Sequence, residues 1–322
     1  METTVLATRF TELVGCSVPL QQAAMGGGSP RLAAAVSEAG ALGMVAAIIY
    51  PKDVLADMLD WLRSQTSRSF GVNFLMPFLN RDCVEVAATR ARVVEFFYGA
   101  PEPSLVQEVH SCGALASWQV GSREEAIAAE NAGCDFIVAQ GVEAGGHVRG
   151  HIGLMVLLTE VLDLVQVPVL AAGGIGTGRA MAAALAAGAS GVRVGTRFVA
   201  AEEAEYHPFY VDALAAASGQ DTILTETFSA MWPDAPHRVL RSAVEAVERF
   251  EGEVVGETSL GGVKMPVPRF SSGPPTRETT GAVEAMALYA GESVGAVRGA
   301  QPAASIVREL ADEAERLLRR WS

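Results

Sequence analysis

Residues 168–198 read PVLAAGGIGTGRAMAAALAAGASGVRVGTRF and contain the clearest indication of the chain's architecture. Two short apolar runs, 168–172 and 191–194, each end at glycines, and an Ala-rich segment separates them. Short apolar runs that end at glycine are typical of buried strands, and the Ala-rich segment predicts a helix. The stretch therefore predicts a strand–helix–strand unit whose two strands are parallel.

The same alternation extends from this stretch in both directions. Further strands are expected at 19–24, 43–49, 70–75, 92–97, 114–119 and 135–139, and helices at 30–40, 51–65, 81–89, 102–111, 122–132, 152–165, 177–187 and 202–217. Eight strand–helix pairs within roughly 200 residues predict an α/β fold, the (β/α)8 TIM barrel. Alternation alone does not show closure, so a doubly wound open sheet is the alternative.

The last third of the chain differs in character. Residues 219–281 are rich in turn-forming residues, as in PDAPHR (233–238) and SSGPPTRETTG (271–281), and predict an irregular excursion that is a candidate lid. Residues 303–320 predict a final helix that packs back on the body. We therefore expect a TIM barrel over 1–218 and a smaller C-terminal helical and irregular extension over 219–322.

Composition limits the classes of function. Half of the 322 residues are hydrophobic, and 37 Asp and Glu against 24 Lys and Arg give a net charge of −13. An acidic surface repels nucleic acids and anionic lipids, and no strongly apolar run is long enough to span a bilayer. The four cysteines lie far apart, so neither a metal site nor a disulfide framework is expected. The composition indicates a cytoplasmic enzyme without nucleic-acid or membrane partners, and it leaves open whether the chain forms a homodimer.

Glycine-rich loops follow the seventh and eighth expected strands. They read AAGGIGTGR (171–179) and GTR (195–197). In a TIM barrel, loops at these positions that lead into a helix bind phosphate through backbone N–H groups. The GGIGTG spacing resembles a dinucleotide fingerprint, but it lies late in the chain and lacks the acidic residue that follows such a fingerprint, so a Rossmann site is discounted. A phosphorylated planar cofactor, flavin mononucleotide (FMN), is the candidate ligand of the barrel mouth.

One histidine follows the sixth expected strand. His147 ends the segment QGVEAGGH (140–147), whose glycines leave the backbone free to approach a flat ligand closely. An imidazole at a strand end ionises near neutral pH and is a candidate general base. A histidine with a purely structural role is the alternative. His151 lies four positions further on, but no Cys pair accompanies the two histidines, which argues against a metal.

Several motifs resemble the nitronate monooxygenase family, formerly called 2-nitropropane dioxygenases. They are PLQQAAMGGGSPRLAAAVSEAGALG (19–43), FGVNF (70–74), AQGVEAGGHVRG (139–150), the stretch at 168–198, HPFY (207–210) and ALYAGESVG (287–295). They follow one another in order over nearly the whole chain. The resemblance implies an FMN-containing TIM barrel with a smaller helical domain. It also implies that alkyl nitronates or nitroalkanes are oxidised with O2 to a carbonyl compound and nitrite.

The resemblance also implies the site residues, position by position. His147 aligns with the family's catalytic histidine. The implied cofactor-binding residues are Ala24, Met25, Gly26, Asn73, Gln119, Gln140, Gly145, Gly146, Gly173, Gly174, Arg193, Val194, Gly195 and Thr196. The chain departs from the family's pattern at Arg193, where an uncharged residue such as Gln is expected, and at Gln119, where some relatives place a lysine near the cofactor. An Arg193 that points inward would add positive charge to the flavin environment.

Other flavin proteins share parts of this pattern. FMN-dependent enoyl-[acyl-carrier-protein] reductases and flavin quinone reductases use NAD(P)H, and the reductases share motifs like EAGGH (143–147) and AAGGI (171–175). A non-catalytic FMN-binding protein is a third interpretation. The sequence leaves these functions open, with a small-molecule substrate and O2, or NAD(P)H, as the expected partners.

Overall fold

Eight parallel strands form the centre of the molecule, whose computed structural model describes residues 5–48, 50–260 and 263–320. The strands are β1 (Leu20–Gln22), β2 (Gly43–Ala46), β3 (Phe70–Leu75), β4 (Val93–Phe97), β5 (Leu115–Val120), β6 (Phe136–Gln140), β8 (Val169–Ala172) and β9 (Gly191–Val194). They pair in the order β1-β9-β8-β6-β5-β4-β3-β2. A parallel bridge between Gln21 and Leu42 then links the two end strands.

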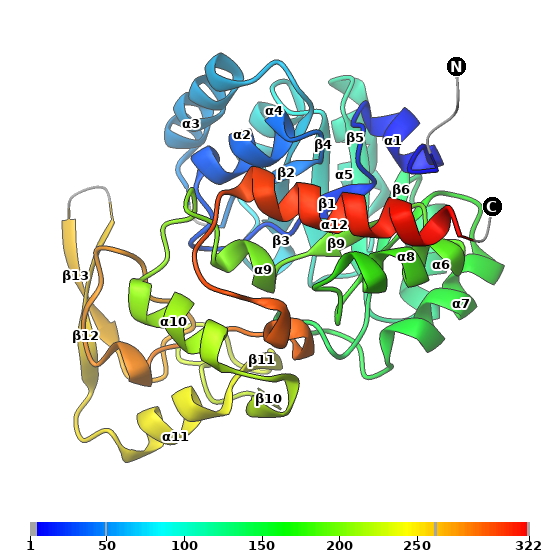
Figure 1. Cartoon of the computed structure of the whole chain (residues 1–322). Coiled ribbons are helices and arrows are strands. Elements are labelled where there is room, and N and C mark those ends of the chain that lie inside the picture. The colour runs from blue at the N-terminus through cyan, green and yellow to red at the C-terminus, as the bar shows by residue number, and fades with distance from the viewer. Residues whose placement is uncertain (1–4, 49, 261–262, 321–322) are drawn as a thin grey trace.

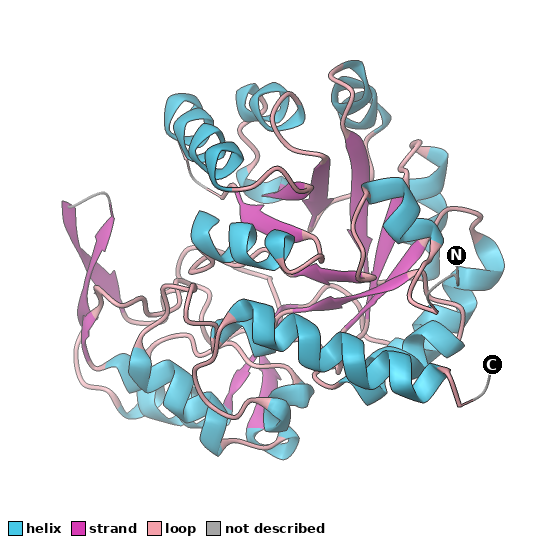
Figure 2. Ribbon diagram, turned by 45° about the horizontal axis from the view of Figure 1, so that its top comes forward, coloured by secondary structure: helices cyan, strands magenta, loops and turns pink. Residues whose placement is uncertain are grey.

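This closure confirms the predicted TIM barrel and excludes the open sheet. Figures 1 and 2 show the strands surrounded by helices. Each strand lies within three residues of its predicted bounds, and Phe70–Leu75 and Gly191–Val194 coincide with theirs. Residue 49, the last of the strand expected at 43–49, lies outside the described residues.

Helices cover the outside of the barrel. Seven of them follow strands β1 to β8: α2 (Pro30–Glu38), α3 (Lys52–Gln65), α4 (Asp82–Ala88), α5 (Pro103–Ser111), α6 (Arg123–Asn131), α7 (Leu154–Leu164) and α8 (Gly178–Ala186). After β9 the expected helix at 202–217 is replaced by a short α9 (Thr196–Val199) and by α10 (Pro208–Ala216). Helix α10 packs on the 3-10 turns η3 (Val283–Ala285) and η4 (Glu292–Ala296) of the C-terminal extension.

The final helix, α12 (Ala303–Leu318), packs on α8 and α2. Because β9 lies between β8 and β1 in the barrel, the space between α8 and α2 is where a helix following β9 would lie. Figure 1 shows α12 in red across this side of the barrel. At the contact, a Cβ on Gly178 would lie 2.5 Å from the Cβ of Glu313, so this close approach requires glycine. The last helix thus completes the outer ring.

The lower part of the barrel interior is apolar. One cluster of buried side chains fills it: Phe10, Val14, Leu42, Met44, Val93, Leu115, Phe136, Val138, Leu170 and Ala172. Phe10 and Val14 come from α1 (Arg9–Val14), which closes the N-terminal end of the barrel. The Phe10 ring meets the Phe136 ring edge-on, with centroids 5.3 Å apart. A ligand therefore has access only from the opposite end, where the strands finish.

The C-terminal extension is more regular than the sequence predicts. It contains two three-stranded sheets, one of β10 (Thr222–Thr225), β11 (His237–Leu240) and β7 (Gly146–His147), and one of β13 (Val263–Pro268), β12 (Val254–Leu260) and β14 (Thr280–Gly281). Helix α11 (Arg241–Arg249) and the turn η2 (Gly219–Asp221) also belong to it. Figure 1 places α11 in yellow, and β12 and β13 in orange, beside the barrel. Strand β7 belongs to the loop after β6, so the first sheet joins the extension to the barrel mouth.

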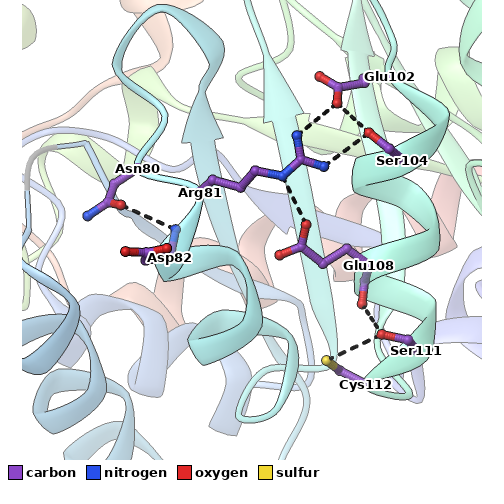
Figure 3. A network of polar contacts seen from close by, with 8 residues as sticks. All are labelled: Asn80, Arg81, Asp82, Glu102, Ser104, Glu108, Ser111 and Cys112. Atoms are coloured by element: carbon purple, nitrogen blue, oxygen red, sulfur yellow. Dashed lines mark hydrogen bonds and ion pairs between the residues drawn. The ribbon is translucent and has the colours of Figure 1, made fainter.

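Surface polar contacts tie neighbouring barrel helices together. Arg81, just before α4, donates to Glu102 Oε1 at 3.0 Å and Ser104 Oγ at 3.0 Å at the start of α5, and to Glu108 Oε2 at 3.2 Å further along that helix (Figure 3). Beside it the Asp82 N–H donates to Asn80 Oδ1 at 3.2 Å, and the short turn η1 (Met76–Phe78) precedes both. Exposed ion pairs of this kind contribute little to stability, so the network mainly orients the loop after β3.

Among the residues described, no helix is both long enough and apolar enough to cross a membrane.

Candidate active site

The loops that carry most of the predicted site residues meet at the C-terminal end of the barrel, because all eight strands are parallel. Residues 24–26 follow β1, Gln140 ends β6, and residues 145–147 lie in the next loop. Gly173 and Gly174 follow β8, while Gly195 and Thr196 follow β9. Three other predicted residues, Asn73, Gln119 and Arg193, lie within strands and turn their side chains into the barrel.

The loop after β8 has a backbone that only glycine adopts readily. Gly173 has φ +108° and Gly174 has φ +65°, both in the left-handed region. Gly174 is exposed, and a Cβ built on it would approach only the side chain of Glu143, at 3.6 Å. The glycine at 174 is therefore required by conformation and leaves the backbone open to a ligand.

The tail of the chain lies against the loops after β6 and β9. The Gly291 N–H donates to Thr196 Oγ1 at 3.0 Å, and the Glu292 N–H donates to the Glu143 carbonyl at 3.0 Å. A Cβ on Gly145 would lie 2.4 Å from the Gly291 nitrogen. Gly145 therefore allows the tail segment at 290–291 to pack here, a role that the sequence analysis did not assign to it.

His147 lies in β7, in the loop after β6, and the residue is half-buried. Its Nε2 is buried and has no hydrogen-bond partner among the described residues. The Gln140 side-chain amide donates to the His147 carbonyl at 3.0 Å, and the Gln140 Oε1 is also buried, with no partner in the described part of the chain. Burial, with a smaller effect of His237, lowers the pKa of His147 to about 3, so the ring is neutral at physiological pH.

A second histidine, His237, lies opposite His147 in the small sheet, with ring centroids 5.3 Å apart. Its Nδ1 is 2.8 Å from the Ala235 carbonyl, and its Nε2 accepts the Phe228 N–H at 3.2 Å. A carbonyl only accepts and an amide N–H only donates, so the ring is neutral with its proton on Nδ1. Burial lowers the pKa of His237 in the same sense. Both nitrogens are used by the backbone, and His237 therefore anchors the two ends of the segment 228–235.

This anchored segment carries Trp232, which covers His147. The indole and the imidazole stack with centroids 4.0 Å apart and planes 26° apart. Trp232 also meets the rings of Tyr98 at 4.6 Å and Phe78 at 5.1 Å. Tyr98 has φ +67°, a strained conformation for a residue other than glycine, and such strain is concentrated at functional sites. Burial raises the pKa of the Tyr98 phenol to about 12, so the phenol is neutral, and the Arg149 guanidinium lies over its ring at 5.7 Å.

A largely apolar surface groove shares Phe78 with these aromatic contacts. It measures about 400 Å³ and is lined by Ala47, Ile48, Tyr50, Pro51, Phe78, Asn80 and Cys83. Phe78 thus contacts Trp232 and also lines the groove. A larger groove of about 530 Å³ lies between α3 and α4 on the outside of the barrel and contains none of the predicted site residues.

A charged network occupies the barrel interior. Arg193 donates to Glu95 Oε2, to Gln119 Oε1 and, at 3.0 Å, to Gln21 Oε1. Glu95 also accepts from Asn73 at 2.9 Å and from Gln21 at 3.1 Å. Arg193 does point inward, as the sequence analysis considered, but the fully buried carboxylate of Glu95 balances its charge.

Four residues near the site were missed from the sequence. Glu95 had a usable signal, because a single acidic residue within the apolar run RVVEFF requires a buried partner. Tyr98, Trp232 and His237 had none, since each depends on a contact with a distant part of the chain. Within the ranges that the structure describes, no three His, Cys, Asp or Glu side chains are grouped to hold a metal ion.

Together these features define a TIM-barrel protein with a glycine-lined site at the ends of its strands, where one histidine has a buried Nε2 without a hydrogen-bond partner among the described residues. The family profile described as nitronate monooxygenase matches residues 7–313. The chain therefore belongs to the nitronate monooxygenase family and is an oxidoreductase of that family.

Individual relatives agree with this assignment. The chain is 29% identical over 294 residues to a probable nitronate monooxygenase of Staphylococcus aureus, covering 76% of this chain and 82% of that protein. Among solved structures, it is similar to a nitroalkane oxidase from Streptomyces ansochromogenes, with 30% identity, a TM-score of 0.78 and coverage of 97% and 99% of the two chains. It is equally similar to FabK from Thermotoga maritima, with 30% identity, a TM-score of 0.80 and coverage of 98% and 99%.

Proposed function

We propose that the protein is an FMN-dependent enzyme that oxidises alkyl nitronates or nitroalkanes with O2, giving a carbonyl compound and nitrite. The observation that carries the proposal is the Nε2 of His147, a buried polar atom without a partner among the described residues, at the ligand-accessible end of the barrel. Buried polar atoms in native proteins normally have partners, and those that do not are concentrated at functional sites. Membership of the family and the similarity to a nitroalkane oxidase support the same reaction.

The residues at the strand ends fit FMN. The left-handed turn at Gly173 and Gly174 leaves its backbone accessible, as close approach of a phosphate requires. The Thr196 hydroxyl accepts from Gly291 and keeps its own proton for donation. Gln140 Oε1 offers a buried acceptor without a partner among the described residues. Bound there, FMN would supply electron transfer between the organic substrate and O2.

The residues of this chain would control the proton and the access to it. His147 is neutral, so the ring has a nitrogen free to take the α-proton of a nitroalkane. The nitronate anion produced beside the ring favours the imidazolium, which raises the pKa of His147 as the proton moves. The aromatic rings of Tyr98 and Trp232 pack on His147 and would shield it from water, and Phe78 packs on Trp232.

The proposal is tested with His147→Ala and two classes of substrate. Oxidation of neutral nitroalkanes should fall on the order of a hundred- to ten-thousand-fold, the usual loss for a positioned general base. Pre-ionised nitronates have no proton to lose, so their oxidation should fall much less. The FMN content of each preparation shows whether the variant is folded. Equal losses on both substrates with FMN retained would mean that His147 orients the substrate and is not a base.

A second candidate is an NAD(P)H-dependent FMN reductase. The similarity to FabK favours it, because it matches the similarity to the nitroalkane oxidase in identity and coverage. If the protein is a reductase, NADH or NADPH should reduce the bound flavin rapidly. If it catalyses the proposed oxidation, it should turn over nitronate rapidly. If neither occurs, the protein only binds FMN.

A further inference from the structure

A buried ion pair crosses the barrel interior from β4 to β9, between Glu95 and Arg193. Three neutral side chains complete its hydrogen bonds, those of Gln21, Asn73 and Gln119. The five residues come from five different strands and lie above the apolar cluster that Phe10 and Val14 close. A buried ion pair adds little net stability over well-packed apolar side chains, because both charges lose their hydration. Stability therefore does not explain why the upper part of the barrel is charged.

The two charged residues of the pair differ in exposure and in their neighbours along the chain. Glu95 is fully buried, whereas the Arg193 side chain keeps 7% of its surface exposed. Arg193 is the penultimate residue of β9 and is followed within three positions by Gly195 and Thr196 of the proposed cofactor site. Glu95 is held from the other side by Asn73 Nδ2 at 2.9 Å. The cation of the pair thus lies on the strand that leads into the proposed cofactor site, and the anion is the less exposed of the two groups.

We propose that Arg193, held in place by Glu95, is a positioning residue that sets the reduction potential of the bound FMN. A flavin gains negative charge when it is reduced, and a fixed cation at low dielectric favours the reduced form. Glu95 keeps the guanidinium inside the barrel and partly offsets its field. The inference rests on the cofactor of the proposed function and is independent of which substrate the enzyme oxidises.

The test is the midpoint potential of the FMN-loaded protein in wild type, Arg193→Gln and Glu95→Gln. Loss of the cation should lower the potential, and loss of the anion should raise it, because Arg193 then acts unopposed. A tenfold change in the ratio of affinities for reduced and oxidised flavin corresponds to about 30 mV for a two-electron couple, and we expect at least this change in each direction. A merely structural pair would give shifts of the same sign or none, and either result overturns the inference.

A relocated cation supplies the control for folding. The Gln119 side chain contacts Arg193 directly, so Gln119→Lys combined with Arg193→Gln places a cation within reach of Glu95. This double variant should have a higher midpoint potential than Glu95→Gln combined with Arg193→Gln, which keeps only neutral groups. The comparison holds even if the single variants release FMN, and equal potentials in the two double variants would overturn the inference. A wild type that binds no FMN would refute the cofactor assignment itself, and the inference with it.

Discussion

The indole of Trp232 lies face to face on the imidazole of His147, with ring centroids 4.0 Å apart. The two residues are 85 positions apart in the chain, and the backbone bonds of His237 hold the segment that brings them together. Trp232 contributes to the burial that lowers the pKa of His147 to about 3. The extension thus determines whether His147 is accessible to water and to a substrate.

Removing the indole should expose the imidazole. In Trp232→Ala we expect the pKa of His147 to rise toward 6.5, because burial is the main cause of its depression. An NMR titration of the ring in the flavin-free protein measures this pKa. The variant should also lose about 3–5 kcal/mol of stability, as buried Trp→Ala changes do. Trp61→Ala, on the exposed side of α3, is the control and should leave the pKa of His147 unchanged. If Trp232→Ala also leaves this pKa unchanged, groups other than Trp232 bury the ring.

The stability of the flavin-free protein should depend on His147 below neutral pH. The pKa of His147 is about 3 in the folded state against 6.5 for the model value, so the unfolded chain binds a proton that the folded protein does not. Unfolding therefore becomes easier as the pH falls from 6.5 toward 3. At pH 5 the contribution is about 2 kcal/mol, from 1.5 pH units at 1.36 kcal/mol each.

Urea unfolding at pH 7 and pH 5 checks this expectation. His147→Gln should reduce the loss of stability between the two pH values, while His237, whose pKa is also lowered, retains a contribution of the same sign. His151→Gln, at an exposed position, should behave as wild type. Identical pH dependence in His147→Gln and wild type would contradict the burial of a neutral ring.

The barrel could be predicted from the sequence because its signals are local. The runs FGVNFL and GVRV have the same first and last residues as the observed strands β3 and β9, because turns flank each run. The site could be predicted only in part. Arg193, the partner of Glu95, lies 98 positions further along the chain. The strand that contains His147, β7, pairs with β11 of the extension. Such pairings depend on tertiary contacts, and the short strands of residues 219–281 lack the alternation that would have identified them.

The turn after β8 is tested with Gly174→Val. A branched side chain at φ +65° is strained, and the variant should lose FMN because the loop changes its backbone conformation. Gly113→Val is the matched control, since Gly113 has φ +83°, has open space around its Cβ position and precedes β5 at the other end of the barrel. Both should lose about 1–2 kcal/mol of stability, but only Gly174→Val should lose flavin, as measured by the absorbance of the purified protein. Flavin loss in neither variant would mean that the β8 turn is structural only.

The contact of the tail with the barrel is tested with Gly145→Ala. The new Cβ would lie 2.4 Å from the Gly291 backbone nitrogen, so the tail segment has to move away from Thr196. We expect weaker FMN binding and faster hydrogen exchange at the Gly291 amide. In Gly295→Ala, four residues further along the same tail, the Cβ meets nothing closer than 3.9 Å and the backbone has no positive φ, so the exchange at Gly291 should stay near the wild-type rate. The same exchange rate in wild type and Gly145→Ala would exclude this role of Gly145.

The central claim is that the bound flavin takes electrons from a nitronate. Anaerobic rapid mixing of the FMN-loaded protein with an alkyl nitronate, and separately with NADH and with NADPH, tests it most directly by following the flavin absorbance. The proposed function requires fast loss of the oxidised flavin spectrum with the nitronate, and only slow change with either nicotinamide. Fast bleaching by NADH or NADPH, with no reaction of the nitronate, would contradict it and identify the protein as a reductase.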